Sequence, residues 1–186
     1  MFIVNRVIEP KRVEEIYRER YKIFVERDRD APAELYKNGL LKDDCDDYAL
    51  HIACYNTENS KLVGFLTVVP RATLNGVLPV EEQHDVLSED NSAEIMRLII
   101  FDELNIKDRG RVLGLLLTEV EKIVLELSLT KLYLVTTAEA QKIYKRIGFE
   151  QIGPYKLYKG VSNECPMALE IENINKKFFK GVNDER

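Results

Sequence analysis

Residues 131–149 read KLYLVTTAEAQKIYKRIGF, a short apolar run followed by a helical segment that stops at a Gly-Phe pair. The apolar, β-rich run at 131–136 predicts a short strand, and residues 138–147 predict a helix. Gly148 stands just past that helix, the position where a glycine commonly ends one. Phe149 opens another predicted strand. This strand–helix–strand unit indicates an α/β architecture.

A second strand–helix unit lies directly upstream. Residues 93–101 read AEIMRLIIF and predict a strand, and residues 109–129 carry apolar side chains on one face, which predicts a long helix. The start of this helix includes RGRVLG at 109–114. Basic residues and backbone N–H groups at a helix start form a place where an anion can dock. A simple strand-to-helix turn is the alternative interpretation of the same residues.

The remaining segments extend this pattern in both directions. Residues 1–8 predict a first strand, and the apolar spacing from Val13 to Phe24 predicts an amphipathic helix. Residues 28–47 predict a loop with a short helix, and residues 72–93 predict a long connection. Further strands are predicted at 49–55, 62–69, 149–158 and 166–171, the first two of these as a hairpin.

Two of these stretches resemble the GNAT superfamily of acyltransferases. Ile-Tyr-Lys-Arg-Ile-Gly-Phe at 143–149 is similar to the GNAT stretch in which a tyrosine shortly precedes a Gly-Phe pair. Arg109 and Gly114 match the superfamily's pyrophosphate loop, and Val112 stands where its first glycine is usual. The resemblance implies a mixed, mostly antiparallel sheet with helices on both faces (α/β, or α+β). It also implies coenzyme A or acyl-CoA as co-substrate, bound by Arg109, Gly110, Arg111, Val112, Leu113 and Gly114 with Ile99 and Ile100.

The N-terminal half has a narrower resemblance. RYKIF at 20–24, DCDD at 44–47 followed by His51, and EIMR at 94–97 are similar to motifs of acyl-homoserine-lactone synthases and related N-acyl amino acid synthases. Met96 replaces a serine of that family, Thr67 replaces an arginine, and the chain has no tryptophan. These departures point to a relative within this branch rather than to a homoserine-lactone synthase itself.

The resemblance assigns roles to single residues. Glu94 would accept the proton of the attacking amine, and Tyr144 would donate a proton to the leaving thiolate. Arg97 should alternate with its neighbours, point to the same side as Ile95, and pair with Asp44 or Asp47. We expect Arg97 and Asp47 to contact the acceptor substrate. The plainer interpretation is a strand-end charge for Glu94 and core packing for Tyr144; His51 is expected to be a satisfied strand histidine.

Composition excludes several other classes. The chain has 186 residues, which suits one domain at 1–172 followed by a polar tail at 173–186. Its net charge of −5 argues against nucleic acid as a partner. Cys45, Cys54 and Cys165 are too scattered for a disulfide framework or a zinc site, so no metal is expected. No apolar run is long enough for a membrane helix, and we expect a cytoplasmic protein.

Together these features predict an N-acyltransferase that moves an acyl group from a pantetheine thioester to an amine of a small molecule. The donor is either acyl-CoA or an acyl-carrier protein, since both present the same arm. Lys142, Lys145 and Arg146 form a basic patch suited to an acidic carrier protein, or simply a solvated helix face. The alternative function is a catalytically degenerate protein of this fold that binds a ligand or partner. A homodimer is left open.

Overall fold

The computed structural model describes residues 1–74, 76–158 and 160–173, so the predicted tail at 173–186 lies outside the description except for Asn173. Within these ranges eight strands form one sheet in the order β1-β2-β3-β4-β5-β8-β6, and β7 also pairs with β8. The strands are β1 (Phe2–Val7), β2 (Leu50–Asn56), β3 (Leu62–Pro70), β4 (Ser92–Ile100), β5 (Lys131–Thr137), β6 (Glu150–Gln151), β7 (Lys156–Tyr158) and β8 (Ser162–Glu170).

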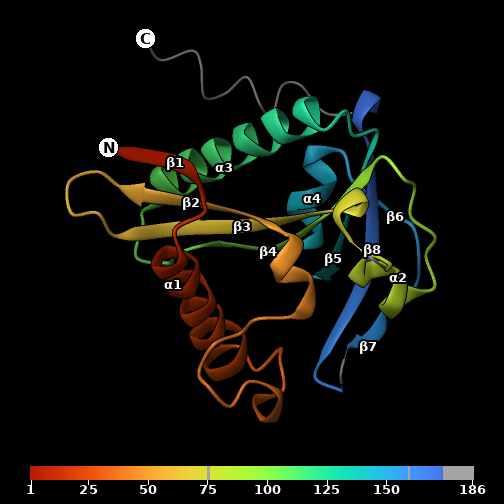
Figure 1. The fold of residues 1–186 in the computed structure, drawn as a ribbon, viewed down its shortest axis with the longest axis horizontal. Coiled ribbons are helices and arrows are strands. Elements are labelled where there is room, and N and C mark those ends of the chain that lie inside the picture. Colours follow the sequence, from red (N-terminus) through yellow and green to blue (C-terminus); the bar gives the residue numbers. More distant parts are fainter. Residues whose placement is uncertain (75, 159, 174–186) are drawn as a thin grey trace.

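Helices cover both faces of this sheet (Figure 1). The α-helices are α1 (Pro10–Arg20), α2 (Pro79–His84), α3 (Ile106–Glu126) and α4 (Gln141–Ile147). A π-helical turn, Tyr21–Arg27, continues α1, and 3₁₀ turns occupy Ala33–Leu35, Asp44–Tyr48, Arg71–Thr73 and Ile171–Asn173. None of the helices in the described ranges is long and apolar enough to cross a membrane.

The two faces have separate hydrophobic cores. The larger core lies under α3 and α4, where residues such as Val112, Leu116 and Ile147 pack against inward-facing strand residues. On the opposite face, Ile16 of α1 packs against Phe65, and Leu78 and Val80 around α2 pack against Tyr133 and other strand residues. The predicted mixed sheet with helices on both faces is therefore confirmed.

Among the described strands, β4 and β5 form the only parallel pair, and their pairing is short. It runs from Ser92 beside Lys131 to Glu94 beside Tyr133 and then stops, although both strands continue. Beyond this point the backbone edges of the two strands separate. The sheet therefore splits in its centre, and an opening forms between the second halves of β4 and β5.

A β-bulge in β4 accompanies the split. The β3–β4 register passes from Phe65 beside Ile99 to Thr67 beside Met96, so β4 contains one extra residue at this place. Arg97, within the bulged stretch, adopts the left-handed conformation that one class of β-bulge uses, with φ of 54°. The extra residue reverses the alternation of side chains. For this reason Ile95 packs into the core under α3, whereas Ile99 packs on the α1 face.

Several boundaries differ from the sequence prediction. Helix α3 begins at Ile106 rather than 109, because its first turn is exposed and its only apolar residue, Ile106, faces away from the core. Asn105 caps the helix through a hydrogen bond of 2.9 Å from the Asp108 N–H. The predicted strand at 149–158 is two short strands, β6 and β7, separated by a turn that contains Gly153 and Pro154. The connection at 72–93 contains the short helix α2, which begins at Pro79.

Candidate functional site

The opening between β4 and β5 contains the two predicted catalytic side chains. A cavity of about 260 Å³, here called the cleft, is lined by residues 94–99 of β4, by residues 135–137 at the end of β5, and by Ala140 and Tyr144 beside and within α4. Glu94 and Tyr144 thus reach one space from two different elements. Phe24 and Ala31 contribute to the wall of the cleft from the α1 side.

Glu94 is a buried carboxyl group at the point where the two strands part. It is 2% exposed, and its Oε2 accepts a hydrogen bond of 2.8 Å from the backbone N–H of Val80 in the first turn of α2. Burial raises the pKa of Glu94 to about 8, while the hydrogen bond from Val80 and the charge of Arg97 act in the opposite direction. A carboxyl group that titrates near neutral pH can both accept and release a proton.

Tyr144 lies in the middle of α4 and is half-buried. Its ring packs edge-on against Phe149 with 6.0 Å between the ring centroids. Burial raises the pKa of Tyr144 to about 12, so the phenol keeps its proton at neutral pH. The residue therefore combines core packing with a lining position in the cleft, and its hydroxyl is in the state that a proton donor needs.

A larger cavity of about 800 Å³ adjoins the cleft on the α2 side of the sheet. Gln83, Met96 and Tyr158 line both spaces, which places the junction two residues beyond Glu94 along β4. Residues of the turn Asp44–Tyr48 and of α2 and β7 form the walls of this larger cavity. The two cavities therefore meet near Glu94.

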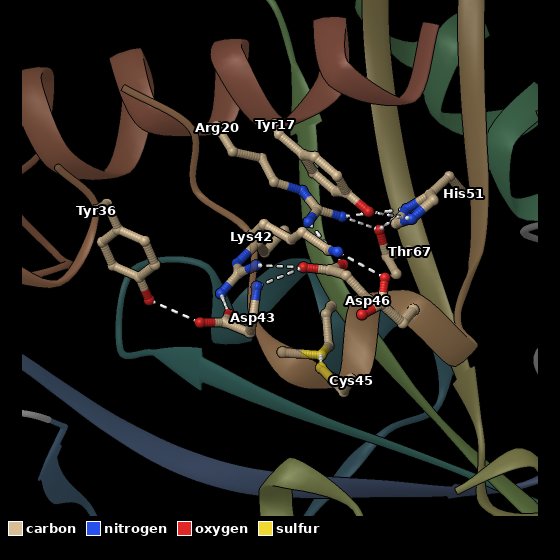
Figure 2. A network of polar contacts seen from close by, with 12 residues as sticks. Tyr17, Arg20, Tyr36, Lys42, Asp43, Cys45, Asp46, His51 and Thr67 are labelled. Carbon is tan, nitrogen blue, oxygen red and sulfur yellow. Dashed lines mark hydrogen bonds and ion pairs between the residues drawn. The ribbon is translucent and has the colours of Figure 1, made fainter. Parts of the chain in front are cut away.

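A buried charge network supports the wall between α1 and this site (Figure 2). Arg20 is 0% exposed, its Nη1 donates to Asp46 Oδ1 at 2.8 Å, and its Nη2 donates to the hydroxyl of Thr67. The Tyr36 hydroxyl donates to Asp43 at 2.7 Å. The network joins α1, the segment before β2, and β3 into one unit. We therefore assign Arg20 and Asp46 a bracing role.

Arg97 completes the network with a pairing that differs from the prediction. Its guanidinium donates to Asp43, and Nη1 lies 3.7 Å from Asp46 Oδ2. The predicted partners, Asp44 and Asp47, are wrong by one residue. The predicted pair, Asp44 and Asp47, and the observed pair, Asp43 and Asp46, have the same three-residue spacing. The 3₁₀ turn directs Asp46 inward, and the side chains of Asp43 and Asp46 also cap this turn.

Asp47, the predicted contact of the acceptor, lies outside both cavities. Its side chain is 62% exposed and pairs with Lys42 at 2.6 Å, and it is not among the residues that line the cleft or the larger cavity. The predicted orientation of Arg97 is wrong as well. The β4 bulge turns its side chain to the face that holds Asp43, opposite to Ile95, although Arg97 does line the cleft.

His51 is a satisfied strand histidine, as predicted. Its Nε2 lies 3.1 Å from the Tyr17 hydroxyl, and its Nδ1 lies 3.1 Å from the Thr67 hydroxyl. Burial and the nearby Arg20 charge lower the pKa of His51 to about 4, so the ring is neutral. Cys54 is a buried core residue, and the three cysteines are free. In the described ranges, no cluster of acidic, histidine and cysteine side chains has the arrangement of a metal site.

The predicted phosphate-binding segment, 109–114, lies within α3. The N–H of Arg109 already donates to the Asn105 carbonyl at 2.9 Å, and the following N–H groups belong to the helix. Val112 is buried against Gly64 of β3, where an added Cβ would approach its Cγ1 to 2.9 Å. The predicted contact of N–H groups 110–114 with phosphates therefore does not fit the helix. Only the first turn and the side chains of Lys107, Arg109 and Arg111 face outward there.

Of the other two predicted donor residues, only Ile99 lines the cleft. Ile99 and Ile100 both line a separate hollow beside Phe101, and Ile100 packs against the core under α3. Sequence reasoning missed Glu164 and Asp30, which also line the cleft and whose pKa values are raised by burial. Neither belongs to a motif, and their place in the cleft depends on how β8 and the segment after the π-helical turn pack around it.

Comparisons with known proteins agree with this geometry. No protein-family model and no curated sequence matches the chain. Among solved structures, the AHL synthase LasI matches with a TM-score of 0.74 and 16% identity over 100% of this chain and 98% of LasI. FeeM, an N-acyl amino acid synthase from uncultured soil microbes, matches with a TM-score of 0.70 and 16% identity over 97% of both chains.

A third structure is BjaI, a CoA-dependent acyl-homoserine lactone synthase solved with SAM and isopentyl-CoA. It matches with a TM-score of 0.69 and 15% identity over 99% of this chain and 88% of BjaI. At these identities the comparisons establish a shared fold along nearly the whole chain. The resemblance deduced from the motifs is thus confirmed at the level of fold.

Proposed function

We propose that this protein is an N-acyltransferase that moves an acyl group from a pantetheine thioester to an amine of a small molecule. The observation that carries the proposal is the meeting of Glu94 and Tyr144 in a cleft that splits the sheet between β4 and β5. The fold shared with LasI, FeeM and BjaI supports it.

The cleft suits the arm of a pantetheine donor. Pairing between β4 and β5 ends at Glu94, so residues 95–99 and 135–137 present strand edges to the cavity. Backbone groups on such edges need hydrogen-bond partners, and the two amides of pantetheine supply donors and acceptors of matching kind. Apolar side chains such as Leu98 and Val135 line the same cavity and would contact the arm.

Glu94 and Tyr144 then divide the proton transfers. The ionised Glu94 takes a proton from the attacking amine as the new C–N bond forms. The C–S bond breaks, and Tyr144 can donate its proton to the leaving sulfur. The pKa of Glu94, raised to about 8 by burial, leaves a useful ionised fraction at neutral pH. The acceptor amine would reach this point from the larger cavity, whose junction with the cleft is lined by Met96.

Phosphates of an acyl-CoA would meet the first turn of α3 rather than a loop at 109–114. The N–H groups of Ile106 and Lys107 and the basic side chains of Arg109 and Arg111 are the available groups. The site is a modest one, because Asn105 already caps the Asp108 N–H and Arg109 lies 3.4 Å from Asp102. This weakness favours donors that are held mainly by the pantetheine arm, including a carrier protein.

The proposal is tested by incubating the protein with acetyl, medium-chain and long-chain thioesters of CoA and of acyl-carrier protein. A panel of amines and amino acids serves as acceptors, and mass spectrometry detects the acylated product. Formation of an amide that depends on Glu94 supports the proposal. Binding of donor without any product would support the degenerate, ligand-binding alternative instead.

The two donor types separate by charge. Lys142 and Lys145 are exposed on α4, the helix that also carries Tyr144. If carrier protein is the donor, reversing both charges to glutamate should slow the reaction at low salt, and added salt should remove much of the difference. Rates with free acyl-CoA should change less. Full carrier-protein rates in the double variant would leave acyl-CoA as the donor.

A further inference from the structure

The basic side chains around the two cavities already have partners. Among the described residues three of them line the cleft or the larger cavity, and an acidic side chain holds each one: Asp43 holds Arg97, Asp47 holds Lys42 and Asp85 holds Lys156. Because these charges are compensated locally, the cavities offer a ligand no basic group that is free of an acidic partner.

The acidic side chains around the larger cavity are in excess. Asp44 reaches it from the 3₁₀ turn before β2, and Glu82 reaches it from α2. Both side chains are exposed, and neither forms an ion pair within the described ranges. The neighbouring cleft supplies no compensation, since its acidic lining residues outnumber Arg97, its basic one. Carboxylates without partners in a cavity attract cations from solvent.

A buried histidine gives a second, independent sign of a ligand in this cavity. His84 ends α2, is 4% exposed and lines the larger cavity, and its Nδ1 has no hydrogen-bond partner among the described residues. Burial and the charge of Lys156 lower the pKa of His84, although the adjacent Asp85 acts in the opposite direction. The ring is therefore neutral, and one of its nitrogens is an acceptor. An N–H group of a ligand would satisfy this nitrogen, which otherwise stays unpaired at a cost to stability.

An ammonium group matches Asp44, Glu82 and His84 together. It carries the charge that the two carboxylates attract and the N–H donor that the imidazole needs. Tyr48 lines the same cavity and is 47% exposed, and its ring adds a surface that cations favour. A carboxylate or phosphate in this place would meet charge of its own sign. It would also have to displace the acidic partners of the two lysines.

We propose that the acceptor is a diamine or polyamine, whose second, protonated amino group is bound in the larger cavity by Asp44, Glu82 and His84. The inference rests on the proposed acyl transfer and names its acceptor class. Gln83 lines both cavities and follows Glu82 along α2, so the first amino group reaches Glu94 from there. The C–N bond then forms and the amine proton passes to Glu94, while the C–S bond breaks and the leaving thiolate takes up a proton.

Three acceptors with one amine and the same methylene chain separate the charge classes. Cadaverine ends in a second ammonium group, hexylamine in a methyl group, and aminocaproate in a carboxylate. Their kcat/KM values are compared with one acyl thioester at low salt, and calorimetry measures their binding without donor. We expect cadaverine to exceed hexylamine by about 4- to 25-fold, since two exposed carboxylates contribute about 2- to 5-fold each, and aminocaproate to rank last. Added salt should reduce the advantage.

Two charge-removing variants locate the effect. Glu82→Gln and Asp44→Asn should each lower the ratio of cadaverine to hexylamine by about 2- to 5-fold. Because both side chains are exposed, the melting temperatures should stay near that of the wild type. Asp90→Asn is the matched control: Asp90 is exposed and lines neither cavity, and its replacement removes the same charge from the protein. This control should keep the wild-type ratio.

The outcomes separate this inference from the proposed function. If none of the acceptors is acylated, the proposed function fails for this class, and the order of affinities from calorimetry still decides the inference. Hexylamine or aminocaproate that equals or exceeds cadaverine in the wild type overturns it. The inference is also overturned if the variant that combines Glu82→Gln with Asp44→Asn keeps the full preference for cadaverine.

Discussion

Replacing Glu94 by glutamine gives the sharpest test of the proposed chemistry. The glutamine carbonyl can still accept the hydrogen bond that Val80 donates at 2.8 Å, so α2 keeps its anchor. The variant loses only the ability to take up a proton. Positioned general bases contribute about 100- to 10,000-fold to rates, and we expect kcat/KM to fall within that range.

The pH dependence makes the test specific. Because the pKa of Glu94 is raised to about 8, kcat/KM of the wild type should rise about tenfold per pH unit below that value and level off above it. The residual activity of Glu94→Gln should lack this limb. Both profiles are measured by following the released thiol, with product confirmed by mass spectrometry.

Stability should change in the opposite sense. The folded-state pKa of about 8 lies above the ordinary 4.5, so the folded protein binds the additional proton between these values. The free energy of unfolding of the wild type therefore falls as pH rises from about 4.5 to 8, whereas that of the glutamine variant does not. Over this range the variant should become more stable relative to the wild type, by at most about 5 kcal/mol if the full pKa shift of Glu94 contributes.

Glu164→Gln is the matched control, since Glu164 lines the same cleft and its pKa is also raised by burial. It should leave turnover nearly unchanged. The reasoning would be refuted if Glu94→Gln retained wild-type kcat/KM with the same pH limb, or if Glu164→Gln reduced activity equally.

Three further changes probe the rest of the site. Tyr144→Phe keeps the ring packed on Phe149, so the melting temperature should stay within the error of the wild type while turnover falls by about 100-fold or more; unchanged turnover would leave Tyr144 a packing role only. Asp46→Asn leaves Arg20 buried without its full countercharge and should lower the free energy of unfolding by about 3–5 kcal/mol. The exposed Asp47→Asn should change it by less than about 0.5 kcal/mol. Equal effects of the two variants in chemical denaturation would contradict the pairing of Asp46, rather than Asp47, with the buried arginine. Gly64→Ala places a Cβ 2.9 Å from both the Ile99 carbonyl and Val112, and should destabilise the protein by about 1–3 kcal/mol, with wild-type stability as the contrary result.

Much of the fold could be predicted because its elements are locally encoded. The α3 helix and strands β2 to β5 carry long apolar patterns, and Gly148 marks the end of α4. The predictions failed where the local signal is weak. The first turn of α3 is polar, α2 is only six residues long, and residues 149–158 contain Gly153 and Pro154 within an apparently continuous strand.

The candidate site shows the same division. The motifs around Glu94 and around Tyr144 marked two residues that line one cleft. The acidic motif before β2 was found but assigned to the wrong register, since Asp43 and Asp46 have the same spacing as Asp44 and Asp47. Spacing alone cannot distinguish two overlapping pairs. The distinction depends on which pair faces the buried Arg20 and Arg97.

The sequence by itself determined the order of the elements, the fold class and the identity of the two residues proposed for proton transfer. The first two follow from periodicity and turn residues, which act over a few positions, whereas the two residues follow from the resemblance of short motifs to a known superfamily. The tertiary structure alone decided where the sheet opens and what meets there. The bulge at Arg97 reverses the side-chain alternation, the parting of β4 from β5 creates the cleft, and α2 brings Val80 to Glu94 and His84 to the larger cavity. Each of these depends on contacts between residues far apart in the chain, which no local pattern specifies.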